Sequence, residues 1–456
     1  MPFSSAPFFA FLTAVCLLYW LAYRWRRIQL AVLAAANLFF LAHFSLIYLA
    51  LPLAALVDFL VGLGMARFRE RPALRRLLLG ISLAVNLSLL LSLKLVPLLS
   101  SKSWRWLLPL SLSFYCFQSL TYTVDLYLGE FEPTRNPMHY LAGALFFPSM
   151  TAGPIPRMGN LLQQLAGPFA LTPEEGAQAL LLIGIGLVKK LLIADFLAHN
   201  LVDRIFDTPA LYSGAEVLIG VYGYALQLFF DFSGYTDLAR GAAILLGIQL
   251  PENFRRPYLS INMAEFWKRW HITFSNWLFF YVFDFLPKKR KLPVLSYVYS
   301  VLVTMMLGGL WHGLSWNFLI WGTLHGMALG VVFAWKRLRR LPSQVWWAKL
   351  LGGLLTFHFV CFTWIFFRTA TLSDALAILR RIASLTWSLE NISLPVAGVL
   401  LAAAAAHCVP PRWFDRAAAL TARAPFWAQG LAMAGLILLL QTLAGRGSAP
   451  FVYGNF

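Results

Sequence analysis

The stretch GGLWHGLSWNFLIWGTLHG, residues 308–326, is rich in tryptophan and contains no Asp, Glu, Lys or Arg. It joins two apolar runs, 293–310 and 312–334, each close to the ~20 mostly apolar residues that a membrane-spanning helix needs. Its ionisable residues are two histidines, His312 and His325. An ionisable side chain inside a membrane costs about 3 kcal/mol or more unless it is paired or faces water. The stretch therefore predicts a membrane protein in which a histidine has a function.

The composition of the whole chain predicts the same class. Of its 456 residues, 60% are hydrophobic and 12% are charged, whereas soluble domains have about 25% charged residues. The long, continuous apolar runs predict an all-α integral membrane protein with a single domain over residues 1–456. We expect about 11–12 spans, near residues 6–23, 28–45, 46–65, 77–99, 104–122, 178–198, 214–232, 293–310, 312–334, 347–367, 393–409 and 426–443. Two shorter segments, 139–152 and 261–284, are predicted to be amphipathic or re-entrant.

The net charge of +18 is distributed as in a membrane protein and not as in a nucleic-acid-binding protein. Basic residues form short clusters, as positive-inside loops do. The first two clusters are separated by two spans, which predicts that they share one side and that the N-terminus is extracytoplasmic. No cleavage site follows residues 6–23, so we expect a retained span and no signal peptide. The clusters are Arg24 to Arg27, Arg67 to Arg76, Lys189 and Lys190, Lys288 to Lys291, and Lys336 to Arg340.

The cysteines and histidines predict neither disulfides nor a metal site. The four cysteines lie mostly in apolar stretches and have no CxxC spacing. The histidines lack the HExxH pattern and form no cluster with cysteines.

The stretch FFPSMTAGPIPRMGN, residues 146–160, contains three prolines, and Arg157 directly follows the last of them. Prolines break helices, and unwound backbone at membrane depth survives only where protein or water satisfies its polar groups. The stretch is either a re-entrant segment that lines a cavity or an ordinary interfacial loop.

The stretch YALQLFFDFSGYTDLARG, residues 224–241, places polar side chains in an apolar run. Asp237 and Arg240 are three residues apart, so we expect them to pair on a helix. Asp231 has no such local partner, and Tyr235 lies between the two aspartates.

The stretch ENFRRPYLSINMAEFWKRWHITFSNWL, residues 252–278, has the tryptophans and cations of a helix at the membrane interface. Glu265 and Arg269 are spaced for an ion pair. His271 ends the basic cluster, and a structural role at the interface is the simpler interpretation of it.

The spacing of His312 and His325 predicts that they do not share a site. On one continuous helix, 13 residues correspond to about 220° of rotation and ~20 Å of rise. They approach each other only if the helix begins after His312 or breaks near Gly313. Two glycines before His312 give a ligand room to approach, whereas His325 is predicted to pack and to form hydrogen bonds.

Taken together, these stretches resemble the membrane-bound O-acyltransferase family. The similarity is carried by WKRWHITFSNWL, GGLWHGLSWNFLIWGTLHG, YALQLFFDFSGYTDLARG, PENFRRPYLS, TVDLYLGE (123–130), FFPSMTAGPIPR and the tail PFVYGNF (450–456). It is closest to the bacterial branch of alginate O-acetylation and teichoic-acid D-alanylation, and it covers about residues 114–334 plus the tail, with further helices in 347–456. Residues 278–291, LFFYVFDFLPKKRK, depart from the family pattern.

The resemblance implies a helical bundle with a central tunnel, in which an acyl group from a cytoplasmic thioester reaches an extracytoplasmic hydroxyl. It implies that His312 is catalytic and that His271 is its neighbour. The other candidates for substrate contact or tunnel lining are Asp231, Tyr235, Asp237, Arg157, Trp311, Asn276 and Asn317.

The same resemblance implies the partners. No cofactor is bound, and the donor is acetyl-CoA or the phosphopantetheine of an acyl-carrier protein. The acceptor is an extracytoplasmic polymer or a partner acetyltransferase, and the protein resides in the bacterial inner membrane among its lipids. Lys288 to Lys291 are predicted to lie on the cytoplasmic side near the donor, although they would serve equally to fix topology.

Histidine suits this chemistry because its pKa lies near neutrality. Burial favours the neutral imidazole, which accepts the hydroxyl proton, and tryptophan walls exclude water that would hydrolyse the acyl group. Two alternatives differ from acetyl transfer: D-alanyl transfer to teichoic acid, and a transporter whose histidine relays protons. The sequence shows no inverted repeat of the kind that transporters have.

Overall fold

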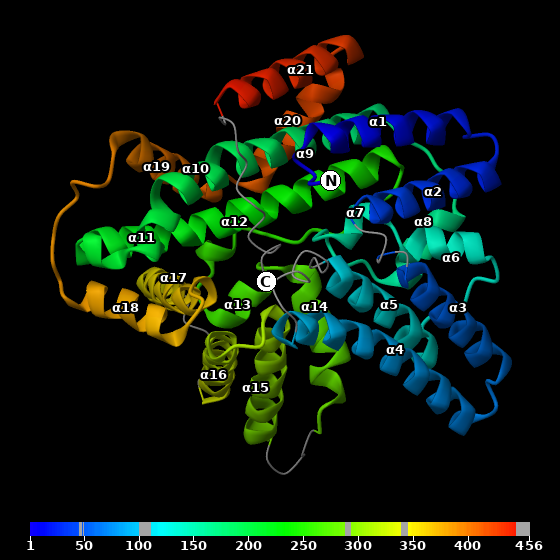
Figure 1. Cartoon of the computed structure of the whole chain (residues 1–456), viewed down its shortest axis with the longest axis horizontal. Coiled ribbons are helices and arrows are strands. Elements are labelled where there is room, and N and C mark those ends of the chain that lie inside the picture. Colours follow the sequence, from blue (N-terminus) through cyan, green and yellow to red (C-terminus); the bar gives the residue numbers. More distant parts are fainter. Residues whose placement is uncertain (45–47, 49, 100–110, 288–292, 339–344, 444–456) are drawn as a thin grey trace.

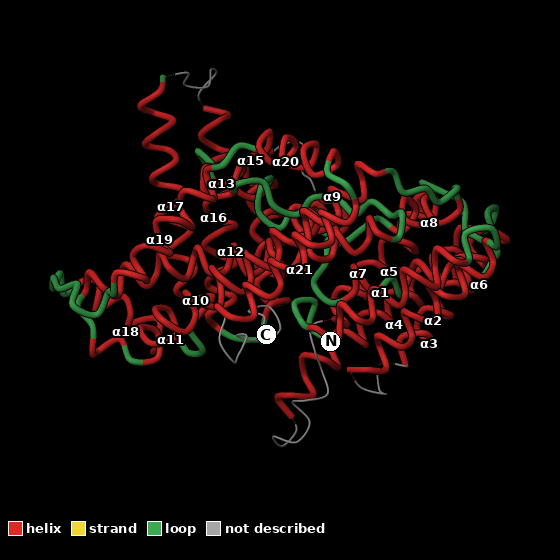
Figure 2. Tube along the Cα trace, turned by 90° about the horizontal axis from the view of Figure 1, so that it is seen from above, coloured by secondary structure: helices red, strands yellow, loops and turns green. Residues whose placement is uncertain are grey.

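The computed structural model describes residues 1–44, 48, 50–99, 111–287, 293–338 and 345–443. Every regular element in these residues is a helix, which confirms the predicted all-α class. The helix α12 (Gly214–Leu245) runs through the middle of the molecule in Figure 1. Viewed from above in Figure 2, α11 (Asp203–Asp207) and α18 (Leu372–Ala383) lie at one end, and α6 (Pro137–Ala144) and α8 (Met158–Ala166) at the other.

The first five predicted spans correspond to five helices. Their boundaries differ from the predicted ones by a few residues, and residues 104–110 of the fifth predicted span lie outside the described residues. The helices are α1 (Ala6–Leu21), α2 (Arg26–Phe44), α3 (Leu51–Arg67), α4 (Pro72–Leu99) and α5 (Ser111–Leu128).

The middle of the chain alternates short helices with the long α12. The predicted re-entrant segment forms α6 and the single turn α7 (Phe147–Met150). The predicted span 178–198 starts as an α-helix and continues through two π-helical turns, which are rare and often found at functional sites. These elements are α9 (Pro173–Leu187), η3 (Val188–Ala194), α10 (Asp195–Leu197), η4 (Ala198–Val202), α11 and the 3₁₀ turn η5 (Pro209–Leu211).

After α12, four short elements occupy the predicted interfacial segment, and longer helices follow. Two amphipathic helices, α18 and α20, were not predicted, because a search for apolar runs does not detect them. The elements are η6 (Pro257–Leu259), α13 (Met263–Trp267), α14 (Ile272–Tyr281), η7 (Phe283–Phe285), α15 (Pro293–His312), α16 (Trp316–Leu338), α17 (Trp346–Arg368), α18, α19 (Leu394–Cys408), α20 (Pro411–Arg423) and α21 (Phe426–Leu443).

Fewer helices have the length of a span than the sequence predicts. Among the described residues, five helices are long and apolar enough to cross a membrane, or six if α19 and α20, which meet at 88°, form one span. Helices such as α1, with 16 residues, reach about 24 Å at 1.5 Å per residue, less than the ~30 Å hydrocarbon core. The predicted number of 11–12 also counts such shorter apolar helices, and it stays a prediction.

The long helix α12 crosses α9 at unusually short range because both helices have glycines at the crossing. A Cβ atom on Gly186 would lie 2.7 Å from the carbonyl oxygen of Gly234, and one on Gly234 would lie 2.9 Å from that of Gly186. Only glycine permits such an approach of two backbones. The crossing brings the C-terminal end of α9 and η3 directly against α12.

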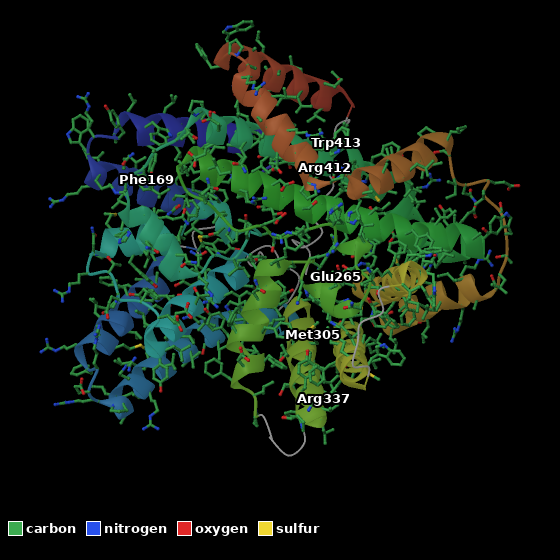
Figure 3. The ribbon with its side chains drawn as sticks, turned by 180° about the vertical axis from the view of Figure 1, so that it is seen from behind. Phe169, Glu265, Met305, Arg337, Arg412 and Trp413 are labelled. Atoms are coloured by element: carbon green, nitrogen blue, oxygen red, sulfur yellow. The ribbon has the colours of Figure 1, made fainter. Side chains whose placement is uncertain are left out.

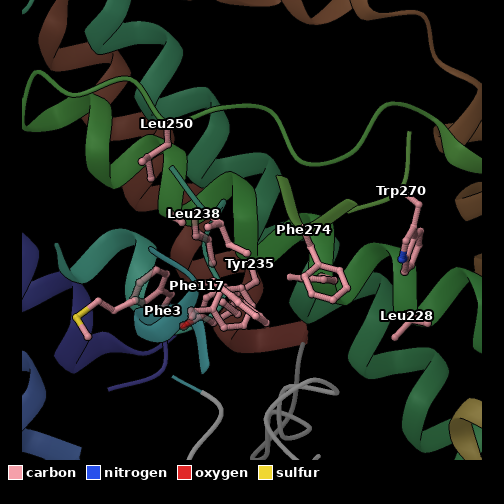
Figure 4. Close-up of a cluster of buried hydrophobic side chains, with 14 of the residues drawn as sticks. Phe3, Phe117, Leu228, Tyr235, Leu238, Leu250, Trp270 and Phe274 are labelled. Carbon is pink, nitrogen blue, oxygen red and sulfur yellow. The ribbon is translucent and has the colours of Figure 1, made fainter. Parts of the chain in front are cut away.

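Aromatic side chains from distant segments fill the core beside α12. Figure 4 shows Phe3, Phe117 of α5, Tyr235 of α12 and Phe274 of α14 gathered in one buried cluster. Within a membrane, such contacts stabilise the fold mainly through close packing, because lipid is as apolar as the side chains themselves.

Candidate active site

The tryptophan-rich stretch folds as a helix corner. α15 ends at His312, α16 begins at Trp316, and residues 313–315 join them. A Cβ atom on Gly309 of α15 would lie less than 3.0 Å from the carbonyl oxygen of Phe318 of α16, so the two backbones touch. This close packing holds His312 at the bend.

The corner brings the two histidines of the stretch near each other. The break near Gly313 that would permit this approach is present, so the separation along one continuous helix does not apply. Both imidazoles contact the Trp321 ring, with centroid distances of 5.3 Å for His312 and 4.6 Å for His325. The prediction that they face opposite sides at different depths was wrong, because the chain reverses direction between them.

The predicted packing role of His325 is confirmed. The Trp267 Nε1–H donates to His325 Nδ1 at 3.2 Å, and His325 Nε2 lies 2.9 Å from Thr363 Oγ1. The Thr363 hydroxyl donates its own proton to the carbonyl oxygen of Val360 at 2.8 Å, so His325 Nε2 is the donor to Thr363. Both ring nitrogens are thus engaged by structural partners in the neutral tautomer.

Aromatic rings surround the buried His312 side chain. Its ring centroid lies 4.5 Å from that of the adjacent Trp311 and 4.8 Å from that of Phe367 on α17. Phe318 and Phe274 lie at 5.9 and 6.1 Å. These rings supply the apolar wall that the sequence predicts around a catalytic histidine.

The other candidate histidine, His271, lies at the start of α14 in a left-handed backbone conformation with φ 42°. Left-handed φ in a residue other than glycine costs of order 1–3 kcal/mol and persists only where surrounding contacts enforce it. His271 Nδ1 lies 3.2 Å from Asn253 Oδ1, which also accepts hydrogen bonds from the Thr273 N–H at 3.1 Å and the Thr273 hydroxyl at 2.9 Å. Asn253 therefore fixes the orientation of the imidazole.

His271 and His312 share an aromatic cluster. The Phe274 ring lies 5.0 Å from the His271 ring and 6.1 Å from the His312 ring. The Trp311 ring lies 6.5 Å from His271 and 4.5 Å from His312. The fold thus brings together two histidines that are 41 residues apart in the sequence.

The prediction of an interfacial position for residues 252–278 was wrong for Trp267, Trp270 and His271. Trp270 and His271 are each 1% exposed, and Trp267 is 5% exposed, so they lie inside the protein. The predicted ion pair between Glu265 and Arg269 is present. These two charges retain some exposure, which explains why the surrounding sequence resembles an interfacial helix.

Comparison with known proteins identifies the family of the chain. The sequence profile of the membrane-bound O-acyltransferase family matches residues 133–372, which include His271, His312 and all of α12 to α17. The chain belongs to this family. It is a multi-pass membrane O-acyltransferase.

Several relatives of this acyltransferase have assigned names. The chain is 34% identical to a probable alginate O-acetylase AlgI of Pseudomonas fluorescens, over 86% of this chain and 78% of the relative. It is 34% identical to a peptidoglycan O-acetyltransferase of Helicobacter pylori, over 77% and 73% respectively. It is 32% identical to a teichoic acid D-alanyltransferase of Bacillus subtilis, over 59% of this chain and 74% of that protein.

The candidate aspartates of the acyltransferase on α12 form ion pairs with the π-helical run. Asp231 lies 2.8 Å from Lys190 Nζ, which also lies 2.8 Å from Asp195. Asp237 pairs with Lys189 at 2.6 Å. The predicted pairing of Asp237 with Arg240 was therefore wrong, and the two lysines are not in a loop between spans. Sequence spacing could not reveal either pair, since both depend on the α9–α12 crossing.

The remaining candidates on α12 and α14 lie at different places. The Tyr235 hydroxyl hydrogen-bonds to Thr151, and its ring stacks on Phe3 with centroids 4.6 Å apart. Asn276 is exposed on α14. Neither of these side chains is among the rings that contact His312.

Of the last three candidates, Trp311 is a member of the histidine cluster, by which we mean His271, His312 and the Phe274 and Trp311 rings that contact both. Asn317 donates to the carbonyl oxygen of Thr369 at 2.8 Å and so ties α16 to the end of α17. The Arg157 guanidinium lies 4.2 Å from the centroid of the Phe280 ring.

The stretch 146–160 is buried, as a re-entrant segment would be. Its freed backbone groups find hydroxyl partners: the Ile155 N–H donates to Thr273 Oγ1 at 3.0 Å, and the Met158 N–H donates to Thr121 Oγ1 at 2.9 Å. Arg157 lines a cavity of about 640 Å³ between α5, α6 and α8. Only the end of the stretch, from Arg157 onward, lines this cavity, and the re-entrant path of the stretch stays a prediction.

Sequence reasoning missed several residues of the site. Asn253, Phe274, Trp321 and Phe367 all contact a histidine, yet only tertiary structure reveals it. Asn253 was the most accessible to prediction, because it is a polar residue between Pro251 and the RRP motif. The described residues contain no group of three or more His, Cys, Asp or Glu arranged to hold a metal ion. The tail motif 450–456 and the cluster Lys288 to Lys291 lie outside the described residues.

Proposed function

We propose that His312 is the general base of an acetyl transfer from a cytoplasmic thioester to a hydroxyl of an extracytoplasmic polysaccharide or peptidoglycan. The observation that carries this proposal is the setting of His312: a buried imidazole at a helix bend, surrounded by aromatic rings, in a chain of this family. An acyl transfer to a hydroxyl needs a base whose pKa lies near neutrality, and histidine meets that need.

In the proposed step, the neutral His312 imidazole takes the proton from the acceptor hydroxyl as its oxygen attacks the thioester carbonyl. The C–O bond forms, the tetrahedral intermediate collapses, and the C–S bond breaks. The departing thiolate then receives the proton from the imidazolium, so the base is regenerated. The Trp311, Trp321 and Phe367 rings limit access of water, which would otherwise take the acyl group.

For His271 we propose a supporting role at the same reacting centre. Its imidazole is oriented by Asn253 and lies against the same Phe274 and Trp311 rings as His312. Its Nδ1–H donates to Asn253 Oδ1, so Nε2 of the neutral ring is an acceptor, and from there it would accept a hydrogen bond from the acceptor hydroxyl and position it for attack. The central tunnel that the family resemblance implies stays a prediction.

The relatives support acetyl transfer over D-alanyl transfer. The proteins named for alginate and peptidoglycan acetylation align over 86% and 77% of this chain, whereas the B. subtilis D-alanyltransferase aligns over 59%. We place the protein in the cytoplasmic membrane with its N-terminus outside, because the basic clusters follow the positive-inside rule on that topology. The donor is then acetyl-CoA or an acyl-carrier protein, and a secreted acetyltransferase is the proposed partner.

The test is donor-dependent acyl transfer by the purified full-length protein. Wild type and His312→Ala are each incubated with radiolabelled acetyl-CoA, and with a D-alanyl-charged carrier protein, in the presence of alginate or peptidoglycan fragments. We expect acetyl incorporation by wild type only. Incorporation of D-alanine without acetyl would replace the proposed acyl group and keep the base. Equal activity of the variant would reject His312 as the base.

A further inference from the structure

A second cavity, of about 400 Å³, lies beside the histidine cluster. It is bounded by α9, α12, the loop 252–256 and the bend between α19 and α20, and we call it the arginine pocket for its lining residues Arg240 and Arg256. Figure 3 shows Arg412 and Trp413 at the end of α20 that meets this bend. The volume falls in the ~300–1,000 Å³ range of small-molecule sites.

The charged residues of the arginine pocket leave two cations without a carboxylate. Lys189 is paired with Asp237, and Arg255 with Glu252 at 2.6 Å. The third acidic residue of the lining, Asp415, is exposed. In the part of the chain that the structure describes, neither Arg240 nor Arg256 has a carboxylate within 4.0 Å.

The buried polar atoms of the arginine pocket that lack a partner are all donors or hydroxyls. They include the Nε–H groups of Arg240 and Arg256 and the Ser233 hydroxyl, each without a hydrogen-bond partner among the described residues. Ser233 is 2% exposed. Buried polar groups are normally hydrogen-bonded, so such atoms on one cavity wall indicate a ligand.

Two further donors complete this set. Asn253 Oδ1 already accepts from Thr273, so its unpartnered Nδ2 carries the hydrogens. His407 Nε2 accepts from the Tyr258 N–H at 3.2 Å, so in the neutral ring its unpartnered Nδ1 carries the proton. Asn253 and His407 are 1% and 5% exposed. The pocket therefore offers several N–H donors and two unneutralised guanidinium groups, which is the chemistry of an anion site.

We propose that the arginine pocket binds a phosphate group of the acyl thioester donor. Guanidinium groups bind phosphate through paired, charge-assisted hydrogen bonds. Coenzyme A and a phosphopantetheinyl carrier both bear such a phosphate, so the site serves either donor. This inference rests on the proposed function. It assigns phosphate recognition to the arginine pocket and not to the Lys288 to Lys291 cluster.

The position of Asn253 favours the donor over a lipid headgroup. Its Oδ1 lies 3.2 Å from His271 Nδ1, while its Nδ2 belongs to the pocket lining. A phosphate held by Nδ2 would fix the same amide that orients His271. Occupation of the arginine pocket is thereby coupled to the geometry of the acyl-transfer site. Such coupling would help to align a bound donor with His271, whereas a structural lipid takes no part in the reaction.

The test measures binding of desulfo-coenzyme A, which keeps the phosphates but has no thiol to acylate. With purified full-length protein we expect Arg240→Gln and Arg256→Gln to weaken binding about 10–100-fold, the loss of one charge-assisted hydrogen bond. Inorganic pyrophosphate should compete in wild type. Arg240→Lys should restore part of the affinity, which shows that the loss is one of charge. The matched control is Arg412→Gln on α20, an exposed arginine outside the lining, which should bind as wild type does.

The outcomes separate this proposal from the proposed function, because binding needs no turnover. His312→Ala should bind desulfo-coenzyme A as wild type does even though it cannot transfer acetyl. Unchanged binding in both glutamine variants would overturn the pocket assignment. Stabilisation of wild type, but not of Arg240→Gln, by phosphatidylglycerol nanodiscs in the absence of any binding of desulfo-coenzyme A would also overturn it and identify a lipid-headgroup site.

Discussion

The α15–α16 corner and the crossing of α12 with the π-helical run both bury titratable side chains, and they do so differently. At the corner, the rings around His312 are those of Trp311, Trp321, Phe318 and Phe367. Such rings supply packing contacts and few hydrogen-bonding groups, a setting that favours an uncharged imidazole.

At the crossing, by contrast, buried side chains of opposite charge pair directly with one another. Lys190 lies 2.8 Å from both Asp195 and Asp231. An isolated buried charge is very costly, so such a group is stable only as part of a paired network. The two regions therefore differ in what holds them together: aromatic packing surrounds the histidine at the corner, and ion pairs join the helices at the crossing.

The largest expected effect is that of His312→Ala on activity. Removal of the general base should reduce acyl transfer by about 10²–10⁴-fold, with little change in folding, because the aromatic rings packed around the imidazole remain in place. The measurement is acetyl incorporation per folded molecule, with size-exclusion profiles and the apparent melting temperature in detergent as controls. If the variant keeps more than a tenth of the wild-type rate, His312 is not the general base, and the corner and the crossing do not differ in the way proposed.

Lys190→Met should act in the opposite way, on stability first. It leaves two buried carboxylates without their shared cation, and breaking such a network costs about 3–5 kcal/mol. We expect a low yield and a clearly lower apparent melting temperature. The matched control is Lys189→Gln, whose effect should be less than half as large, because its pair with Asp237 lines a cavity and Arg240 lies one turn away.

A rescue experiment sharpens the Lys190 prediction. Combining Lys190→Met with Asp195→Asn and Asp231→Asn removes the uncompensated charges, and much of the lost stability should return. If the triple variant were as unstable as Lys190→Met alone, the destabilisation would come from packing and not from charge.

His271→Gln should lower the rate of acyl transfer by about 10–100-fold, the loss of one hydrogen bond that positions the acceptor hydroxyl. In a shared site, His271→Gln combined with His312→Ala should be no slower than His312→Ala alone. The check is the set of four rates in a double-mutant cycle. Strictly additive losses would place the two histidines in independent roles despite their common contact with Phe274.

His325→Ala should have the smallest effect on chemistry and a moderate one on stability. Its loss leaves the Trp267 N–H without an acceptor and removes the donor to the Thr363 hydroxyl oxygen, at about 1–3 kcal/mol. Activity per folded molecule should stay within a few-fold of wild type. A normally folded but inactive variant would show that His325 contributes to catalysis through its contact with Trp321.

Much of the fold was accessible from the sequence, because apolar runs report helices directly. The two helices α15 and α16 and the packing role of His325 also followed from local features of the sequence, whereas the catalytic role of His312 comes from the family resemblance and stays a prediction. The interruptions within helices did not follow, since a run such as 178–198 has the hydropathy of a helix whether or not π-helical turns interrupt it.

The contacts between distant segments were out of reach. Asp231 had no partner within helical spacing, and Lys190 seemed to belong to a basic loop, until the Gly186–Gly234 crossing placed them side by side. Likewise, tryptophans beside cations are typical of an interface, yet Trp270 is buried. Amino-acid type reports the polarity of a neighbourhood, whereas burial depends on which helices pack against it.

The Thr273 hydroxyl joins an early part of the chain to a much later one. It accepts from the Ile155 N–H and donates to Asn253, which in turn orients His271. A nascent chain of 250 residues contains the turn around Ile155 but neither His271 nor His312. The histidine cluster therefore forms only after the later segment has been synthesised and has packed against the earlier one.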